Sequence, residues 1–170
     1  MNLQLIGGIL IIAGCGGVGF GMALNYKREE AALEKLYKAL EFMNCELAYR
    51  LTPLPELCRK VGSFSQGRVG QVFSDLAEEL DRQISPDVSC CMAAVLEKIH
   101  DLPGKTRSAL LELGKTLGCF DLDGQVSGIT LVKALCEKEI ESLATNRTQR
   151  IRCYQTLGLC AGAALAILFI

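Results

Sequence analysis

Three groups of residues in this sequence are of the types that chemistry requires. Gly104, Lys105 and Thr106 match the end of a phosphate-binding loop, in which backbone amides and a lysine hold the phosphates of a nucleotide. That loop also needs a glycine five residues before its second one, where this chain has Ile99, and a buried strand before it. The triplet therefore predicts a helix start with a solvated lysine, and we expect no nucleotide binding.

The second group has the composition of a calcium loop. Asp121, Asp123 and Gly124 would fit if Gly124 took the sixth position of that loop. Cys119 would then stand at the first position and Thr130 at the twelfth, where a bidentate carboxylate is needed. The two aspartates instead favour an N-cap, because their side chains can accept hydrogen bonds from free amides at the start of a helix.

The third group is the set of cysteines. They are odd in number and scattered, and no two have the CxxC spacing of a metal or redox site. Free buried thiols act as small hydrophobic groups, so we expect core packing in a reducing compartment. His100 is the one histidine, and no nucleophile has a base at readable spacing. We therefore predict no metal, no cofactor and no catalytic residue. The cysteines are Cys15, Cys45, Cys58, Cys90, Cys91, Cys119, Cys136, Cys153 and Cys160.

Both ends of the chain are apolar and carry no side chain that is charged at neutral pH, over residues 3–24 and 154–170. As helices these runs reach about 33 Å and about 25 Å, against a hydrocarbon core of about 30 Å. We predict three regions: transmembrane helix 1 at 1–25, a cytoplasmic all-helical domain at 26–152 and transmembrane helix 2 at 153–170. The net charge of −1 argues against nucleic acid as a partner.

Basic residues at the inner ends of both apolar runs predict the orientation. Lys27 and Arg28 follow the first run directly, and Arg147, Arg150 and Arg152 precede the second. Because basic residues stay on the cytoplasmic side, the middle domain is expected in the cytoplasm. Small residues recur every fourth position within each run, which allows close helix packing in a membrane. These residues are Ala13, Gly17 and Gly21 in the first run, and Gly158, Gly162 and Ala166 in the second.

The middle region is rich in Leu, Ala, Glu and Lys, with apolar residues at steps of three and four. The first predicted helix runs from about residue 25 to about residue 51, with one leucine-rich stripe. Thr52 then predicts an N-cap and Pro53 the first residue of a second helix, and residues 62–67 predict a loop. Ser85 and Pro86 predict the start of a later helix. Six helices with short connections favour an all-α, antiparallel six-helix bundle-like domain.

Two sequence blocks resemble a known family. The first is the run Glu-Leu-Ala-Tyr-Arg-Leu-Thr-Pro-Leu-Pro-Glu at 46–56, and the second is Leu-Gly-Lys-Thr-Leu-Gly at 113–118, followed by Asp121 and Gln125. Together with Leu157 and Gly158 before an apolar end, they resemble the stage III sporulation protein AB family. That family is similar to the cytoplasmic helical domains of the type II secretion system platform protein F.

The resemblance implies a place in the mother-cell membrane around the forespore, within a channel complex. It also implies contact with other stage III sporulation channel proteins, including a cytoplasmic ATPase. The residues expected to maintain the fold or meet a partner are Glu46, Tyr49, Thr52, Pro53, Leu54, Gly114, Thr116, Gly118, Asp121 and Gln125. For four of these residues we expect a role in maintaining the fold. They are Pro53, through a rigid turn, Leu54, through burial, and Gly114 and Gly118, through close helix approach.

The functional hypothesis is a non-catalytic membrane scaffold of a secretion-like channel that acts during sporulation. Its helical domain would dock partner proteins, and the chain could form a homo-oligomer. The alternative is a two-span membrane sensor or assembly subunit that relays helix displacement, although the outer segments are too short to form a sensing domain.

Overall fold

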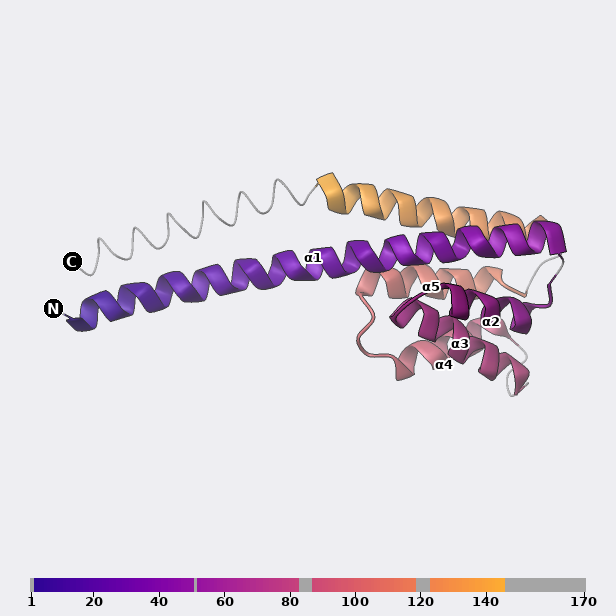
Figure 1. The fold of residues 1–170 in the computed structure, drawn as a ribbon, viewed down its shortest axis with the longest axis horizontal. Helices are drawn as coiled ribbons and strands as arrows, with labels where there is room; N and C mark the ends of the chain where they lie inside the picture. Colours follow the sequence, from indigo (N-terminus) through magenta and orange to yellow (C-terminus); the bar gives the residue numbers. More distant parts are fainter. Residues whose placement is uncertain (1, 51, 83–86, 119–122, 146–170) are drawn as a thin grey trace. The chain divides into compact units, whose positions relative to one another are not determined.

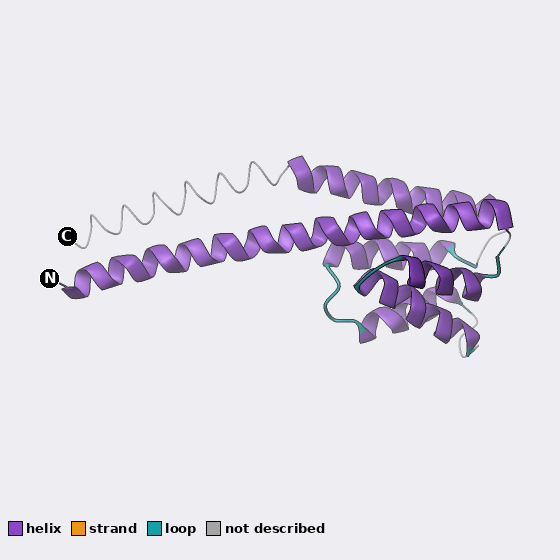
Figure 2. Cartoon of the chain, in the orientation of Figure 1, coloured by secondary structure: helices purple, strands orange, loops and turns teal. Residues whose placement is uncertain are grey.

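The computed structural model describes residues 2–50, 52–82, 87–118 and 123–145, with side chains from residue 24 onwards. These residues are all-α, as predicted, and no strand occurs among them (Figures 1 and 2). The labelled helices are α1 (Asn2–Arg50), α2 (Leu54–Phe64), α3 (Arg68–Asp81), α4 (Val88–Lys98) and α5 (Gly104–Thr116). A sixth helical segment covers residues 123–145.

The chain divides into two units, one of which is residues 29–141. The second unit contains residues 1–28 and 142–170. Ala13, Gly17 and Gly21 fall on α1, where the helix but not its side chains is described. The second predicted span, with Gly158, Gly162 and Ala166, lies outside the described residues.

No helix among the residues whose side chains are described is long and apolar enough to cross a membrane.

The core of the 29–141 unit is built from apolar stripes on its helices. The predicted leucine stripe of α1 is confirmed: its residues at 33, 36, 40 and 43 are fully buried, and the one at 47 is 4% exposed. Phe73 of α3 is the largest fully buried side chain among the residues whose side chains are described. Each such side chain contributes about 1.5–3 kcal/mol when removed from water, so packing rather than polar contacts stabilises the fold.

Helices α2 and α3 approach each other through glycine, which corrects one prediction. The loop expected at residues 62–67 begins later, because α2 continues to Phe64. Gly62 lies inside α2, and a Cβ there would stand 2.3 Å from Ser74 Oγ. Of the two glycines that bound the expected loop, Gly67, with φ +78°, is the turn residue. Gly62 therefore permits close helix packing. The sequence pattern alone does not show whether a glycine has this role or forms a turn.

Two predicted helix starts are also corrected. Pro53, rather than Thr52, is the N-cap of α2, and it supplies no side-chain hydrogen bond. The cap of α4 is Asp87, whose carboxylate accepts a hydrogen bond from the Ser89 amide at 3.1 Å. The carboxylate satisfies an amide that the helix leaves without a partner. Ser85 and Pro86, expected at this start, lie outside the described residues.

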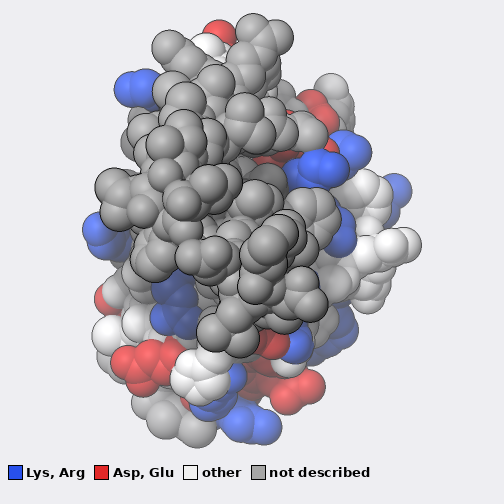
Figure 3. Space-filling view, turned by 90° about the vertical axis from the view of Figure 1, so that its left-hand side faces the viewer, with Lys and Arg blue, Asp and Glu red and all other residues white. Residues whose placement is uncertain are grey.

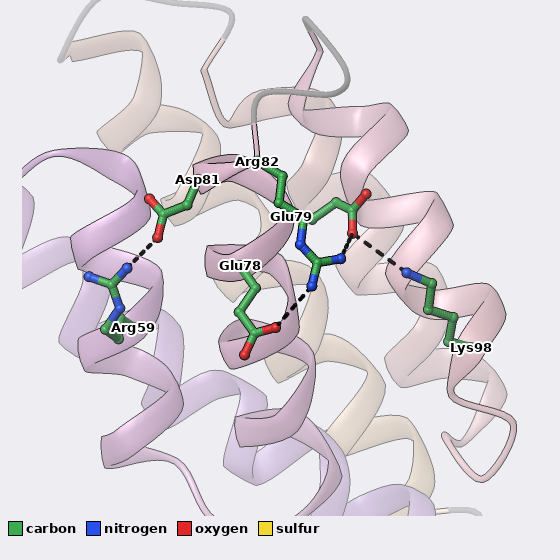
Figure 4. Close-up of polar contacts among 6 residues, drawn as sticks. All are labelled: Arg59, Glu78, Glu79, Asp81, Arg82 and Lys98. Atoms are coloured by element: carbon green, nitrogen blue, oxygen red, sulfur yellow. Dashed lines mark hydrogen bonds and ion pairs between the residues drawn. The ribbon is translucent and has the colours of Figure 1, made fainter.

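The outer surfaces of α2, α3 and α4 are linked by ion pairs (Figure 4). Arg59 of α2 pairs with Asp81 of α3. Glu79 of α3 lies 3.5 Å from Lys98 of α4, and Arg82 lies within 4 Å of both Glu78 and Glu79. Such exposed pairs contribute at most about 1 kcal/mol each. The described part of the face in Figure 3 likewise has basic side chains beside acidic ones.

Candidate functional site

The Gly-Lys-Thr triplet forms the first turn of α5, which confirms the predicted helix start. The lysine side chain remains 39% exposed, and it also forms an ion pair that was not expected, because Lys105 Nζ lies 2.5 Å from a carboxylate oxygen of Glu139. The Lys105 backbone amide donates to Glu29 of α1 at 2.6 Å. The hydroxyl-bearing Thr106 is fully buried. Carboxylates thus occupy the positions where a phosphate would need free amides and a free ammonium group.

The described cysteine thiols do not form a reactive centre. Burial raises the pKa of Cys58 to about 12 and that of Cys136 to about 11, so both thiols stay protonated at neutral pH. Cys45 and Cys90 are exposed. Among the described residues there is no group of three or more His, Cys, Asp and Glu side chains that could hold a metal ion.

Glu46 is the polar centre of the first family block. Its carboxylate accepts hydrogen bonds from Lys60 Nζ at 3.0 Å and from the Thr52 hydroxyl at 3.3 Å. The Arg50 guanidinium lies 3.6 Å away. The hydrogen bond from Lys60 is the main cause that lowers the pKa of Glu46, and the same contact raises the pKa of Lys60. Glu46 therefore ties α2 to the end of α1 across the turn at Thr52 and Pro53.

The two family blocks meet at the end of α5. Gly118 has φ +79°, and a Cβ there would stand 2.5 Å from Val88 Cγ2 and 3.8 Å from Leu54 Cδ2. The equivalent atom on Gly114 would stand 2.8 Å from Met92 Cβ. Both glycines therefore allow α4 to approach α5 closely, and Leu54 at the start of α2 closes one side of this contact.

Thr116 brings the last described helix against α5. Its hydroxyl donates to the Leu113 carbonyl at 2.9 Å. A Cβ on Gly128 would stand 2.6 Å from Thr116 Cβ, so the two helices are close at this point. Gln125 is partly buried on the same helix, and Asp121 lies outside the described residues. The second family block thus contacts α4, the start of α2 and the helix at 123–145.

Tyr49 differs from the other residues of its block, because it is 86% exposed. One neighbouring feature was not recognised in the sequence: the rings of Phe42 and Phe64 stack, with centroids 4.7 Å apart and planes 8° from parallel. Phe64 was expected in a loop, so its pairing with α1 was missed. An extension of the α2 stripe by one turn would have placed it beside α1.

The family of this chain follows from a comparison of its whole sequence, and not of the two blocks alone. Residues 4–170 match the profile of the family described as stage III sporulation protein AB. The chain belongs to this family. A curated relative, stage III sporulation protein AB of Bacillus subtilis (strain 168), is 25% identical over 169 residues, which are 98% of each chain.

A solved structure supports the fold. The chain is similar to a structure of stage III sporulation protein AB with a TM-score of 0.63 and 22% sequence identity. The similarity covers 72% of this chain and 98% of the other. The family membership makes this a sporulation-related protein, and the structural likeness shows a shared helical fold.

Glu46→Gln should reduce stability at neutral pH and have little effect in acid. The folded-state pKa of Glu46 is lowered, so its charged form stabilises the fold above the unfolded-state pKa. That contribution is lost as the pH falls through the folded-state value. Urea unfolding of both proteins from pH 7 to pH 3 tests this. Glu34→Gln, at an exposed position on α1 without an ion pair to a described residue, is the control. A constant difference between wild type and Glu46→Gln across this range would contradict the prediction.

Proposed function

We propose that this protein is a non-catalytic membrane scaffold of a channel complex that connects mother cell and forespore during sporulation. The observation that carries the proposal is the match of residues 4–170 to one sporulation family. In the described domain, the residues of the two family blocks mostly contact other helices of the same domain. Tyr49, which is directed to solvent, is available for a partner.

Membrane attachment is part of the proposal and rests on the sequence. Residues 3–24 and 154–170 include no Asp, Glu, Lys, Arg or His, and basic residues follow the first run and precede the second. Such flanks favour a cytoplasmic domain held by both ends. An apolar run of this kind partitions into lipid rather than water, because each apolar side chain that is exposed to water costs free energy.

The proposal of a non-catalytic role is supported by the state of the groups that could react. The Gly-Lys-Thr triplet is closed by Glu29 and Glu139, and the thiols of Cys58 and Cys136 are held neutral by burial. The proposed partners are other stage III channel proteins, among them a cytoplasmic ATPase of the secretion type. This assignment follows from the resemblance of the family to secretion platform proteins.

Deletion of the gene in the source organism tests the sporulation role. The count of heat-resistant spores should fall to background, and the full-length chain supplied in trans should restore it. Gly104→Ala should also restore it, because a Cβ at Gly104 meets nothing within 4 Å. A deletion strain that forms spores at the parental level would refute the role.

A further inference from the structure

Helix α2 runs antiparallel to α1, and side chains along the two helices form one exposed surface. Three proximities define the direction: Lys60 with Glu46, Phe64 with Phe42, and Gly67 near Lys35. Positions later in α2 thus meet positions earlier in α1. We call this the α1/α2 surface. It consists of Lys35, Lys38, Phe42, Cys45, Tyr49 and Arg50 of α1, with Lys60 and Phe64 of α2.

The middle of this surface is apolar and open to solvent. Tyr49 is 86% exposed and Phe64 is 54% exposed, and Phe64 is held in place by its stack on Phe42. Cys45, between Phe42 and Tyr49 on the same side of α1, is also exposed. Ordered aromatic side chains that are left in water are typical of the centre of a protein interface.

The charges around the aromatic centre are mainly positive. Lys35 and Lys38, exposed on α1, have no ion-pair partner among the described residues. At the other end, the side chain of Arg50 is 69% exposed, whereas its partner Glu46 is only 11% exposed. The carboxylate is therefore turned inward, and a partner would meet the cation.

Lys60 adds a fourth cation to this rim, with its side chain 34% exposed. The outward carboxylates nearby are Glu56, which lies 3.4 Å from Lys60, Glu34 at the edge of the surface, and Glu41, which pairs with Lys133 at 3.2 Å. Arg50 and Lys60 are paired with Glu46 and Glu56, so the excess positive charge lies at Lys35 and Lys38. The surface therefore combines an aromatic centre with a positive end at Lys35 and Lys38.

We propose that the α1/α2 surface docks an acidic amphipathic helix of a partner protein. Positions 38, 42, 45 and 49 repeat at steps of three and four, so they form a ridge along which another helix can pack its own apolar stripe. Acidic residues beside that stripe complement Lys35, Lys38 and Arg50. If a second copy of this chain packed on the ridge in parallel register, Lys35 and Lys38 would face the same lysines of that copy, and the like charges would repel. The inference rests on the proposed scaffold function and names the face and the chemical class of the partner.

Site-specific photo-crosslinking in sporulating cells tests the inference with the full-length chain. The photoreactive residue p-benzoyl-phenylalanine replaces Tyr49, and a matched control carries it at Leu131, which is 56% exposed on the helix at 123–145. Crosslinked peptides are identified by mass spectrometry. The same crosslink is measured with Lys35→Glu and Lys38→Glu combined, and with Lys35→Gln and Lys38→Gln combined.

We expect crosslinking at position 49 to a partner segment that alternates apolar and acidic residues. The combined charge reversal should lower the yield about tenfold, and the neutral pair should lower it less. Crosslinking at position 131 to that segment should be absent. Both charge variants lie on an exposed face, and equal steady-state protein levels show that they fold.

Several outcomes would overturn the inference. One is a crosslinked product at position 49 that contains a second copy of this chain, lipid or a basic segment. Another is a crosslink yield that the combined charge reversal leaves unchanged. A third is an equal crosslink yield at positions 49 and 131. Failure of the proposed function has a different signature, because spore counts would then not depend on the chain. Normal complementation by the combined charge-reversal variant would reject the docking surface and leave the scaffold role standing.

Discussion

Gly70→Ala should lower the free energy of unfolding by about 2–3 kcal/mol, which is the cost of overpacking a close helix contact. Gly70 is buried in α3, where a Cβ would stand 1.9 Å from the Ser65 carbonyl oxygen and 2.9 Å from the Gly62 carbonyl oxygen. Both atoms are backbone, so the clash cannot be relieved by rotating a side chain. Helix propensity favours alanine by only about 1 kcal/mol, which is less than the cost of separating α2 from α3.

Gly104→Ala is the matched control for this change. Gly104 is exposed at the first residue of α5, and a Cβ there has no neighbour within 4 Å. The control should be as stable as wild type or more stable by up to about 1 kcal/mol. Urea unfolding of the full-length proteins in mild detergent, followed by circular dichroism, measures both. Equal stability of the two variants would show that α2 and α3 are not in this close contact.

Phe73→Ala should remove about 3–5 kcal/mol of stability, because it empties a fully enclosed site. Phe73 is the largest of the side chains that the described core buries completely. The loss combines the transfer free energy of the ring with the cavity that remains. Thermal unfolding should therefore shift to a markedly lower temperature.

Phe64→Ala is the same chemical change at a half-exposed site, and it separates stability from docking. With 54% of Phe64 exposed, less apolar area is lost, and only its stack on Phe42 is removed. We expect a loss of about 1 kcal/mol, but reduced partner crosslinking at Tyr49. If Phe64→Ala were as damaging to folding as Phe73→Ala, Phe64 would belong to the core and not to a docking surface.

Much of the fold could be predicted from the sequence because helix periodicity is a local signal. The leucine-rich stripe of α1 and the end of this helix before Pro53 could both be predicted from the sequence pattern. The errors arose where a residue has two physical uses. Gly62 suggested a turn but serves helix contact, and Thr52 suggested a cap but its hydroxyl donates to Glu46. Only the positions of α3 and α1 in space decide between these uses.

The candidate site was predictable to a smaller extent, because it depends on contacts between distant segments. The family blocks could be found in the sequence, but nothing local shows that Leu54 lies beside Gly118. The Gly-Lys-Thr triplet was correctly read as a helix start, whereas its closure by Glu29 and Glu139 is a tertiary contact. The stack of Phe42 on Phe64 was missed for the same reason.

The central claim is that this chain holds other proteins together at the membrane during sporulation. The most direct test is the composition of the complex purified through an affinity tag on the full-length chain, from detergent-solubilised membranes of sporulating cells. The account predicts that other stage III sporulation proteins and a cytoplasmic ATPase are recovered in reproducible ratio to the chain, and that Gly70→Ala loses them while Gly104→Ala does not. Recovery of the folded chain alone, or its presence only in the soluble fraction, would contradict the account.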